Sequence, residues 1–305
     1  MTARFILSLD CEGKWGSADI LAANHRRDLT DRKLAAAYRS ILDLLDEYGI
    51  AATFAFAGLF SQSAEAFADL RPDLERFSRF APEYVRPALD DIDQTNGSGW
   101  HGHDLVEAVT DARSNHEIAL HGVTHVPWTS LSDDAAKAEL HLFEQLSGSV
   151  RQSRTFVFPR NLVAHTELLA DHGFQGFRTA RASRSRLSSL LSEFNLFERP
   201  DPSVRGTGIV AIPPGYFLNW RSGLRRAVPT LVTKLRARHL LDQASDGRVV
   251  HYWLHPENIA TAPTTIGLLQ MLLREVAVRR DAGKCEVMTQ LDYCRSMQRP
   301  SALLA

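Results

Sequence analysis

The sequence is poor in three features that would mark particular classes of protein. It has only three cysteines in 305 residues, an odd number that is typical of a reducing compartment and offers no disulfide framework. No stretch approaches the roughly 20 apolar residues that a membrane-spanning helix needs. Lysine plus arginine (35) and aspartate plus glutamate (36) nearly balance, so the net charge of −1 gives no general attraction to nucleic acid or anionic lipid. These shortages argue against a disulfide-rich scaffold, a transmembrane protein and a nucleic-acid-binding protein.

The N-terminus lacks the apolar core of a secretory signal, because residues 1–4 lead directly into a short apolar run at 5–9. Together with the cysteine count, this predicts a cytoplasmic protein. Hydrophobic residues make up 44% of the chain, which is enough for a substantial core.

Apolar runs typical of buried strands alternate with stretches typical of helices. Residues 31–47 place apolar side chains at helical spacing, and Gly49 follows where the helix should end. The alternation predicts an α/β fold with a parallel sheet or barrel. No linker divides the chain, so we expect one domain over residues 1–305. Strands are expected at 5–9, 51–56, 117–120, 155–158, 176–178, 209–212, 248–253 and 286–288, and further helices at 131–146, 164–172 and 265–280.

Residues 58–104 interrupt this alternation and are predicted to be an insertion. It could be a lid or substrate wall near the catalytic end of a barrel, or a helical excursion that covers one side. Trp100, His101 and His103 close the segment; they could touch the site, although a role in stapling the start of a helix is favoured.

His121 and His125 are the most informative pair of polar residues. They follow the apolar run at 117–120 and are four positions apart. If the backbone turns helically there, both rings lie on one face and could reach one divalent metal. The alternative is two polar residues that cap a loop or form hydrogen bonds in the core.

Asp10, Glu12, Arg160 and His255 also follow predicted strands. Of two carboxylates at one strand end, one could bind a metal and the other accept a proton, although Asp and Gly also favour plain turns. An arginine beside a carboxylate lowers its pKa and orients it. Histidine is suited to donate a proton near neutral pH. The ordinary alternatives are that Arg160 is a surface residue and that His255 is hydrogen-bonded in the core. The order of all these motifs along the chain indicates a catalytic site more specifically than any one motif does.

With these pieces in order, the sequence resembles the polysaccharide deacetylase family, also called the NodB-homology or carbohydrate esterase family 4 group. Within the family it looks most like a branch found in bacterial surface-sugar assembly, such as lipopolysaccharide and O-antigen biosynthesis. The resemblance implies an irregular (β/α) barrel of about seven strands. The matching pieces are Asp10-Cys11-Glu12, Thr53-Phe54, His121-Gly122-Val123-Thr124-His125, Phe158-Pro159-Arg160-Asn161 and Leu254-His255-Pro256, and Trp100 to Val109 and Trp253 to Asn258 carry the closer likeness.

The resemblance implies a divalent metal held by Glu12, His121 and His125, with zinc first and cobalt, nickel or iron as alternatives. The family's usual first motif has two adjacent aspartates, whereas Cys11 stands in the second place here. Three alternatives therefore stay open: Asp10 binds the metal itself, a Cys11 thiolate binds a soft metal, or Cys11 is a small buried residue.

The resemblance also implies the reaction, which is hydrolysis of an N-acyl group on an amino sugar, with N-acetyl as the first candidate. Asp10 would be the base, Arg160 would keep Asp10 charged and in place, and His255 would protonate the departing amine. The sugar could be free, nucleotide-linked or lipid-linked, and the oligomeric state is not predicted. The rival hypotheses are a deformylase or cyclic-amide hydrolase on the same scaffold, and a catalytically silent sugar-binding relative.

Residues 220–241 mix arginine and lysine with leucine and valine, which is typical of a basic amphipathic helix. An ordinary helix with a solvated basic face is the favoured interpretation, and contact with an anionic membrane surface is the alternative. Pro229 is expected to break or kink this helix.

Overall fold

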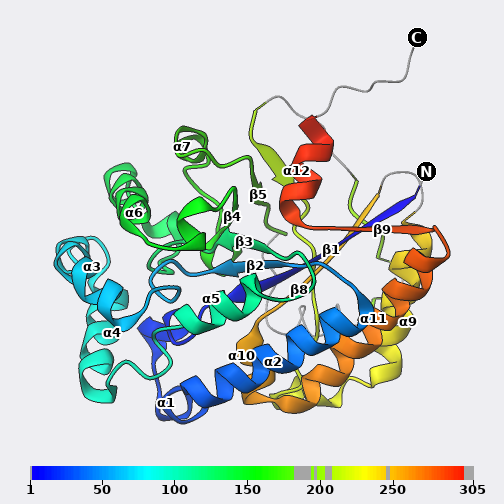
Figure 1. Ribbon diagram of the computed structural model, residues 1–305, viewed down its shortest axis with the longest axis horizontal. Helices are drawn as coiled ribbons and strands as arrows, with labels where there is room; N and C mark the ends of the chain where they lie inside the picture. The colour runs from blue at the N-terminus through cyan, green and yellow to red at the C-terminus, as the bar shows by residue number, and fades with distance from the viewer. Residues whose placement is uncertain (1, 182–193, 196–197, 203–207, 245–247, 299–305) are drawn as a thin grey trace.

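The computed structural model describes residues 2–181, 194–195, 198–202, 208–244 and 248–298. Within them, one curled parallel sheet forms the centre of the molecule, and helices surround it (Figure 1). The strand order is β6-β5-β4-β3-β2-β1-β8-β7, and β9 pairs with the first half of β1. The predicted α/β fold is confirmed, as an open half-barrel. The strands are β1 (Ala3–Cys11), β2 (Thr53–Phe56), β3 (Glu117–Leu120), β4 (Thr155–Val157), β5 (Gly176–Arg178), β6 (Val210–Ile212), β7 (Tyr216–Phe217), β8 (Val249–Leu254) and β9 (Cys285–Met288).

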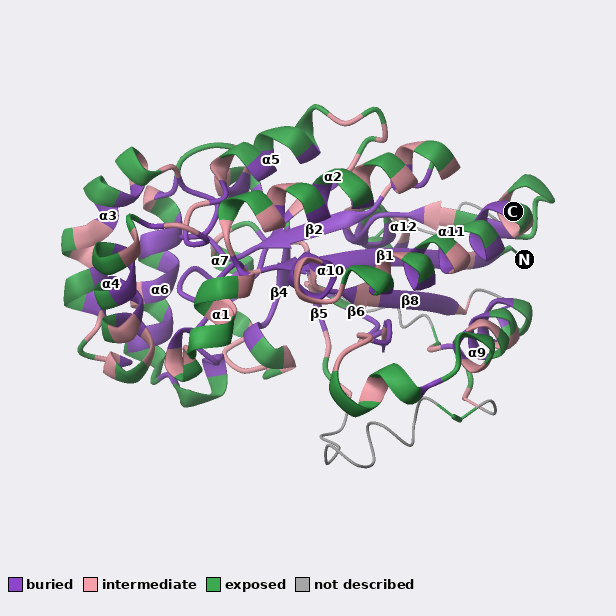
Figure 2. Cartoon of the chain, turned by 90° about the horizontal axis from the view of Figure 1, so that it is seen from below, coloured by how far each residue is buried: buried purple, intermediate pink, exposed green. Residues whose placement is uncertain are grey.

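The helices bury one side against the rest of the molecule and expose the other, as the burial colours show (Figure 2). α2 packs against α10 and α11, and α11 packs against α9. α2 ends where predicted, because Gly49 adopts a left-handed conformation (φ 58°). The helices are α1 (Ala23–Asp28), α2 (Asp31–Tyr48), α3 (Ala64–Phe77), α4 (Pro82–Thr95), α5 (His103–Thr110), α6 (Asp133–Gln145), α7 (Glu167–Asp171), α9 (Thr230–Gln243), α10 (Pro256–Thr261), α11 (Ile266–Asp281) and α12 (Gln290–Gln298), with short 3-10 turns η1 (Trp15–Ile20), η2 (Trp128–Ser130), η3 (Ser149–Gln152), η4 (Pro159–Asn161), η5 (Gly223–Ala227) and η6 (Pro263–Thr265).

The two faces of the sheet have different contents. Successive side chains of a strand alternate between faces. The odd-numbered residues of β1 pack in the main core, whereas Asp10 faces the concave interior. There its register partner on β2 is Ala55, and the partner of Ala55 on β3 is Ala119. These small side chains leave room on the concave face for larger polar groups.

The segment 58–104 is helical, with α3 packed against α6 and α4 packed against η1. Trp100 is fully buried, its indole N–H donates to Asp91 Oδ2 (2.9 Å), and its ring meets Trp15 edge-on at 5.1 Å. Trp100 is therefore a core residue, and the predicted role in stapling the start of a helix stays a prediction.

The basic stretch at 220–241 does not form one continuous helix. η5 ends at Ala227, Pro229 precedes α9, and the predicted break is found there. Among the described residues, no helix combines the length and apolarity needed to cross a membrane.

Candidate metal centre and active site

Side chains from three strand ends converge at the carboxyl edge of the sheet. Glu12 follows β1, His121 and His125 follow β3, and His255 follows β8. Glu12 Oε1 lies 2.9 Å from His121 Nε2, 3.0 Å from His125 Nε2 and 3.3 Å from His255 Nε2. Parallel strands end at the same edge of a sheet, so residues more than 100 positions apart can share one site.

The two histidines of the HxxxH motif do not lie on a helix. Gly122 and His125 have positive φ angles (65° and 61°), and the backbone between the histidines forms a tight loop. Gly58 N–H donates to Gly122 O at 2.8 Å and ties this loop to the end of β2. The rings still face one another, with centroids 4.9 Å apart. The helical turn that would place both rings on one face is therefore not present, and the loop brings the two rings together instead.

Glu12, His121 and His125 fit a divalent metal. Their donor atoms all lie within 4.8 Å of one another. His121 Nδ1 lies 2.8 Å from the Val157 carbonyl oxygen, which can only accept, so Nδ1 carries the proton and Nε2 offers its lone pair. One carboxylate oxygen and two imidazole nitrogens are a donor set for zinc and related ions. Burial opposes the charge on Glu12, but His125 and His255 outweigh it and hold the pKa of Glu12 well below its ordinary value.

Asp10 forms a buried ion pair with Arg178, not with Arg160. Arg178 Nη1 and Nη2 donate to Asp10 Oδ1 and Oδ2 at 2.7 and 2.6 Å, and both side chains are almost fully buried. Burial alone would raise the pKa of Asp10, but the guanidinium of Arg178, together with His121 and His255, lowers it. Asp10 therefore stays charged, as expected, through a different arginine.

Arg160 lies at the mouth of the site and contacts other groups. Its Nη2 pairs with Asp19 Oδ1 at 2.5 Å, and its guanidinium lies 5.4 Å from the centroid of the Tyr84 ring. Arg160 and Asn161 both have φ of 56°, so the chain turns sharply after β4. The expected contact between Arg160 and Asp10 is thus corrected. The turn instead brings Asn161 Oδ1 within 2.8 Å of Arg178 Nη2.

Arg178 is also held by a chain of hydrogen bonds through Ser8 and His251. Arg178 Nη1 donates to Ser8 Oγ (3.2 Å), which lies 2.8 Å from His251 Nε2. His251 Nδ1 lies 2.7 Å from the Pro213 carbonyl oxygen, so Nδ1 carries the proton and Nε2 accepts from Ser8. His251 is fully buried, and burial together with the charge of Arg178 lowers its pKa to about 3. His251 is therefore a neutral core residue that orients the polar interior.

His255 is the histidine of the site with an accessible side chain, which is 25% exposed. Its Nδ1 lies 3.3 Å from Asn258 Nδ2, and its Nε2 faces Glu12 and Asp10. Burial lowers its pKa, but the negative charges of Glu12 and Asp10 outweigh this effect and raise it to about 9. His255 can therefore carry a proton toward the centre of the site.

Cys11 points away from this site. It is fully buried in the main core, and its thiol donates weakly to Leu9 O at 3.5 Å. Burial, with the nearby charge of Glu257, raises the thiol pKa well above its ordinary value. Cys11 belongs to neither of the ligand groups found among the described residues. The structure therefore favours a small buried residue over a thiolate ligand at this position. Asp10 stays open as a ligand, because it forms the second of these groups with Glu12 and His255.

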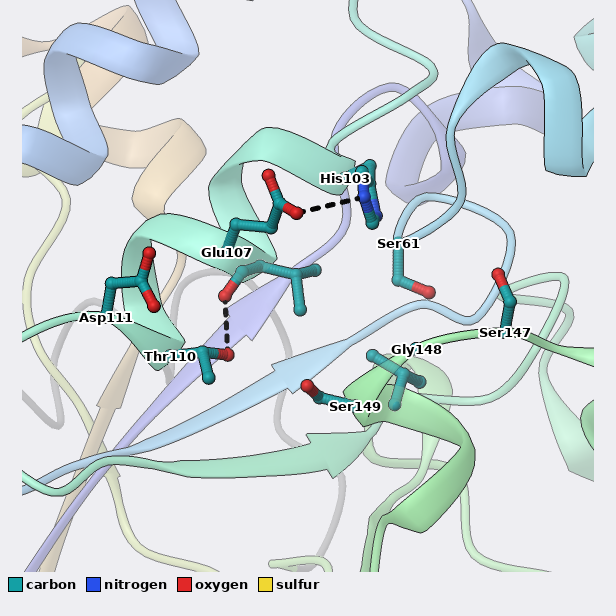
Figure 3. A pocket seen from close by; sticks show the side chains of 10 residues that line it. Ser61, His103, Glu107, Thr110, Asp111, Ser147, Gly148 and Ser149 are labelled. Carbon is teal, nitrogen blue, oxygen red and sulfur yellow. Dashed lines mark hydrogen bonds and ion pairs between the residues drawn. The ribbon is translucent and has the colours of Figure 1, made fainter.

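A hollow away from the proposed metal ligands lies between α5 and the loop before β4 (Figure 3). Its volume is about 260 Å³, and Ser61, Ser147 and Ser149 contribute to its polar lining. His103 lines it and lies 3.4 Å from Glu107 Oε1, its neighbour one turn along α5. None of the predicted ligands or catalytic residues lines this hollow.

The parallel half-barrel and the cluster of possible metal ligands at its carboxyl edge resemble the arrangement expected of a polysaccharide deacetylase. Residues 29–162 match the family model described as polysaccharide deacetylase, which confirms the predicted resemblance to that family over this part of the chain. This range includes both histidines of the HxxxH motif and Arg160, whereas Asp10, Glu12 and His255 lie outside it. The family supports a deacetylase activity, that is, hydrolysis of an amide. No curated protein matches the chain.

Solved structures share the fold at low sequence identity. A protein from Mycobacterium smegmatis described as a polysaccharide deacetylase is 15% identical, with a TM-score of 0.59 over 100% of this chain and 94% of that one. A counterpart from Pseudomonas aeruginosa PAO1 is 12% identical, with a TM-score of 0.59 over 99% and 93%. PuuE allantoinase is 11% identical, with a TM-score of 0.54 over 96% and 90%. At these identities the likeness concerns the fold alone.

Proposed function

We propose that this protein is a metal-dependent hydrolase that removes an N-acyl group from an amino sugar used in bacterial surface-polysaccharide assembly. The first candidate for this group is N-acetyl. One observation carries the proposal. Glu12 Oε1 lies within 3.3 Å of three imidazole nitrogens, beside a buried carboxylate that an arginine holds in its charged form. In our proposal this arrangement would supply metal ligands, a base and an acid at a single edge of the sheet.

Glu12, His121 and His125 would hold the ion, with zinc as the first candidate. When bound, a divalent ion would make the acyl carbonyl more electrophilic and water at the site more acidic. Asp10, oriented by Arg178, accepts a proton from the water whose oxygen attacks the acyl carbon. His255 donates a proton from Nε2 to the amine nitrogen as the C–N bond breaks. The products are then a free amine and a carboxylic acid.

We propose that Arg160 lies on the side of the site where the substrate binds. Its side chain is about one-third exposed, and it links η4 to Asp19 of η1 and to Tyr84 of α4. We propose that α3 and α4 form a wall beside the sugar, with Arg160 at its inner edge. We further propose a cytoplasmic enzyme that acts on an intracellular sugar intermediate, as a single domain.

The first experiment measures metal content by elemental mass spectrometry, on wild type and His121→Ala purified without a His-tag. About one equivalent in the wild type, lost in the variant, supports the centre. No metal in the wild type, even after incubation with zinc, cobalt or nickel, contradicts it and favours a silent sugar-binding protein.

The second experiment tests the reaction. A panel of N-acetyl and N-formyl amino sugars, free, nucleotide-linked and lipid-linked, is assayed together with cyclic amides. Release of acetate from a sugar supports the proposal, whereas turnover of cyclic amides or N-formyl sugars alone favours the rival hydrolases. His255→Ala should keep its metal and lose a hundred- to ten-thousand-fold in rate, roughly the value of one general acid. Retained turnover would remove His255 from that role.

A further inference from the structure

Two buried carboxylates lie directly behind the turns that carry the metal ligands. Glu139 belongs to α6 and is fully buried, and Glu257 belongs to α10 and is 8% exposed. Across the part of the chain that the structure describes, neither is paired with a lysine or arginine within 4 Å. A buried carboxylate without a cation is costly unless its oxygens accept hydrogen bonds. The donors that each carboxylate binds therefore indicate what it does.

Glu139 binds the loop between the two histidines. Its Oε1 accepts from the backbone N–H groups of Val123 (2.7 Å) and Thr124 (3.2 Å), and its Oε2 from Thr124 Oγ1 (3.3 Å). The first N–H groups of a turn that follows a strand have no carbonyl partner within the turn, so they need an acceptor from elsewhere. Here the side chain of Glu139 is that acceptor, and the loop that brings His121 and His125 together depends on it.

Glu257 binds the turn that carries the third ligand. Its Oε1 accepts from the N–H groups of Glu12 (3.0 Å) and Gly13 (2.6 Å), while its Oε2 is buried without a partner among the described residues. Glu257 lies in the first turn of α10, two residues after His255. One short stretch of chain therefore carries the proton donor and anchors the backbone of the ligand Glu12.

We propose that Glu139 and Glu257 are positioning residues of the metal centre, each fixing one ligand turn through a pair of backbone N–H groups. This inference rests on the proposed metal site. Groups that orient metal ligands typically contribute 10- to 100-fold to metal affinity. The reach of each carboxylate, rather than its charge, is the property that matters, because a single oxygen of each accepts both backbone hydrogen bonds.

Two substitutions at each position separate reach from charge. Glu139→Asp and Glu257→Asp keep the charge but withdraw the oxygen by one methylene. Glu139→Gln and Glu257→Gln keep the reach and lose the charge. Metal-free protein is titrated with cobalt(II) in competition with a chelator. The aspartate variants should bind cobalt roughly 10- to 100-fold more weakly, and the glutamine variants within a few-fold of the wild type.

Glu117 provides a matched control at the opposite end of β3. It is 8% exposed, and its Oε2 accepts from Thr53 Oγ1 (2.7 Å) and from the N–H of Leu291 (2.9 Å). Glu117→Asp should lower the melting temperature and leave cobalt affinity unchanged. Loss of affinity in this control would show that any buried carboxylate has the same effect, which would overturn the proposal.

Folded aspartate variants at 139 and 257 that bind cobalt like the wild type would overturn the inference, and so would glutamine variants as weak as the aspartate ones. If the wild type binds no cobalt, the proposed metal function fails, and hydrogen exchange of the metal-free protein then tests the positioning role separately. Peptides covering residues 9–14 and 121–126 should exchange faster in the aspartate variants than in the glutamine variants. Equal exchange in both would refute the positioning role.

Discussion

Replacing Arg178 by methionine should lower the free energy of unfolding far more than replacing an arginine of a surface ion pair. Arg178 makes two short hydrogen bonds to Asp10, and its guanidinium also lies 4.9 Å from the centroid of the Trp253 ring. The substitution would leave the carboxylate of Asp10 buried and unpaired. Breaking a buried pair in this way typically costs about 3–5 kcal/mol in the free energy of unfolding.

The chain offers a control with the same bond geometry on its surface. Arg71 donates to both oxygens of Asp93 at 2.6 and 2.7 Å, but the two side chains are 33% and 55% exposed. An exposed pair contributes about 0–1 kcal/mol, so Arg71→Met should have little effect. The contrast between the two variants isolates burial as the cause.

The assay is urea denaturation of metal-free protein at pH 7.5, followed by circular dichroism. Adding Asp10→Asn to Arg178→Met should recover most of the lost stability, because the unpaired charge is then gone. If Arg178→Met costs no more than Arg71→Met, or if the double variant is no more stable than the single one, the reasoning is refuted.

Three further predictions concern the interior of the protein. His251→Gln should reduce the loss of stability on acidification. The pKa of His251 in the folded protein is lowered to about 3, so below pH 6.5 only the unfolded chain binds the proton. Between pH 8 and pH 5 the free energy of unfolding, measured by urea denaturation, should therefore fall by about 2 kcal/mol more in the wild type than in the variant. Cys11→Ala should retain one metal equivalent by elemental analysis, and native Cys11 should resist thiol reagents because burial raises its pKa; loss of metal would restore the thiolate hypothesis. Gly13→Ala should lower the melting temperature by several degrees, because Gly13 has φ of 55° and a Cβ there would lie 2.7 Å from Gly99 O and press on Phe60; an unchanged melting temperature would contradict this.

Much of the fold could be predicted because the signals are local. Strand and helix positions follow from hydrophobic spacing, so α2 ends at Gly49 as expected and β3 has its predicted bounds. The proximity of Glu12 and His121 could also be predicted, since each directly follows a strand and parallel strands end at one edge, and His125 lies in the loop that begins at His121. The two-residue strand β7 (Tyr216–Phe217) carries too little pattern to have been found.

Other parts of the site depend on shapes that local patterns do not encode. Residues 176–178 are predicted to be a strand, and Arg178 at its buried end could have been recognised as a site residue. No residue near it in the sequence indicates that Asp10 is its partner. The hydrogen bonds that fix the HxxxH loop come from Glu139 on a later helix, so the spacing of the two histidines could not show whether the backbone between them turns helically.

The sequence by itself therefore determined the alternation of strands and helices, the edge at which the polar residues gather, and the side chains that we propose as metal ligands. Only the tertiary structure decided which arginine holds Asp10. β5 and β1 are separated by three strands in the sheet, and its curvature alone brings Arg178 across the concave face to Asp10. Curvature arises from the twist and packing of the whole sheet, so it is a property that no short stretch of sequence carries.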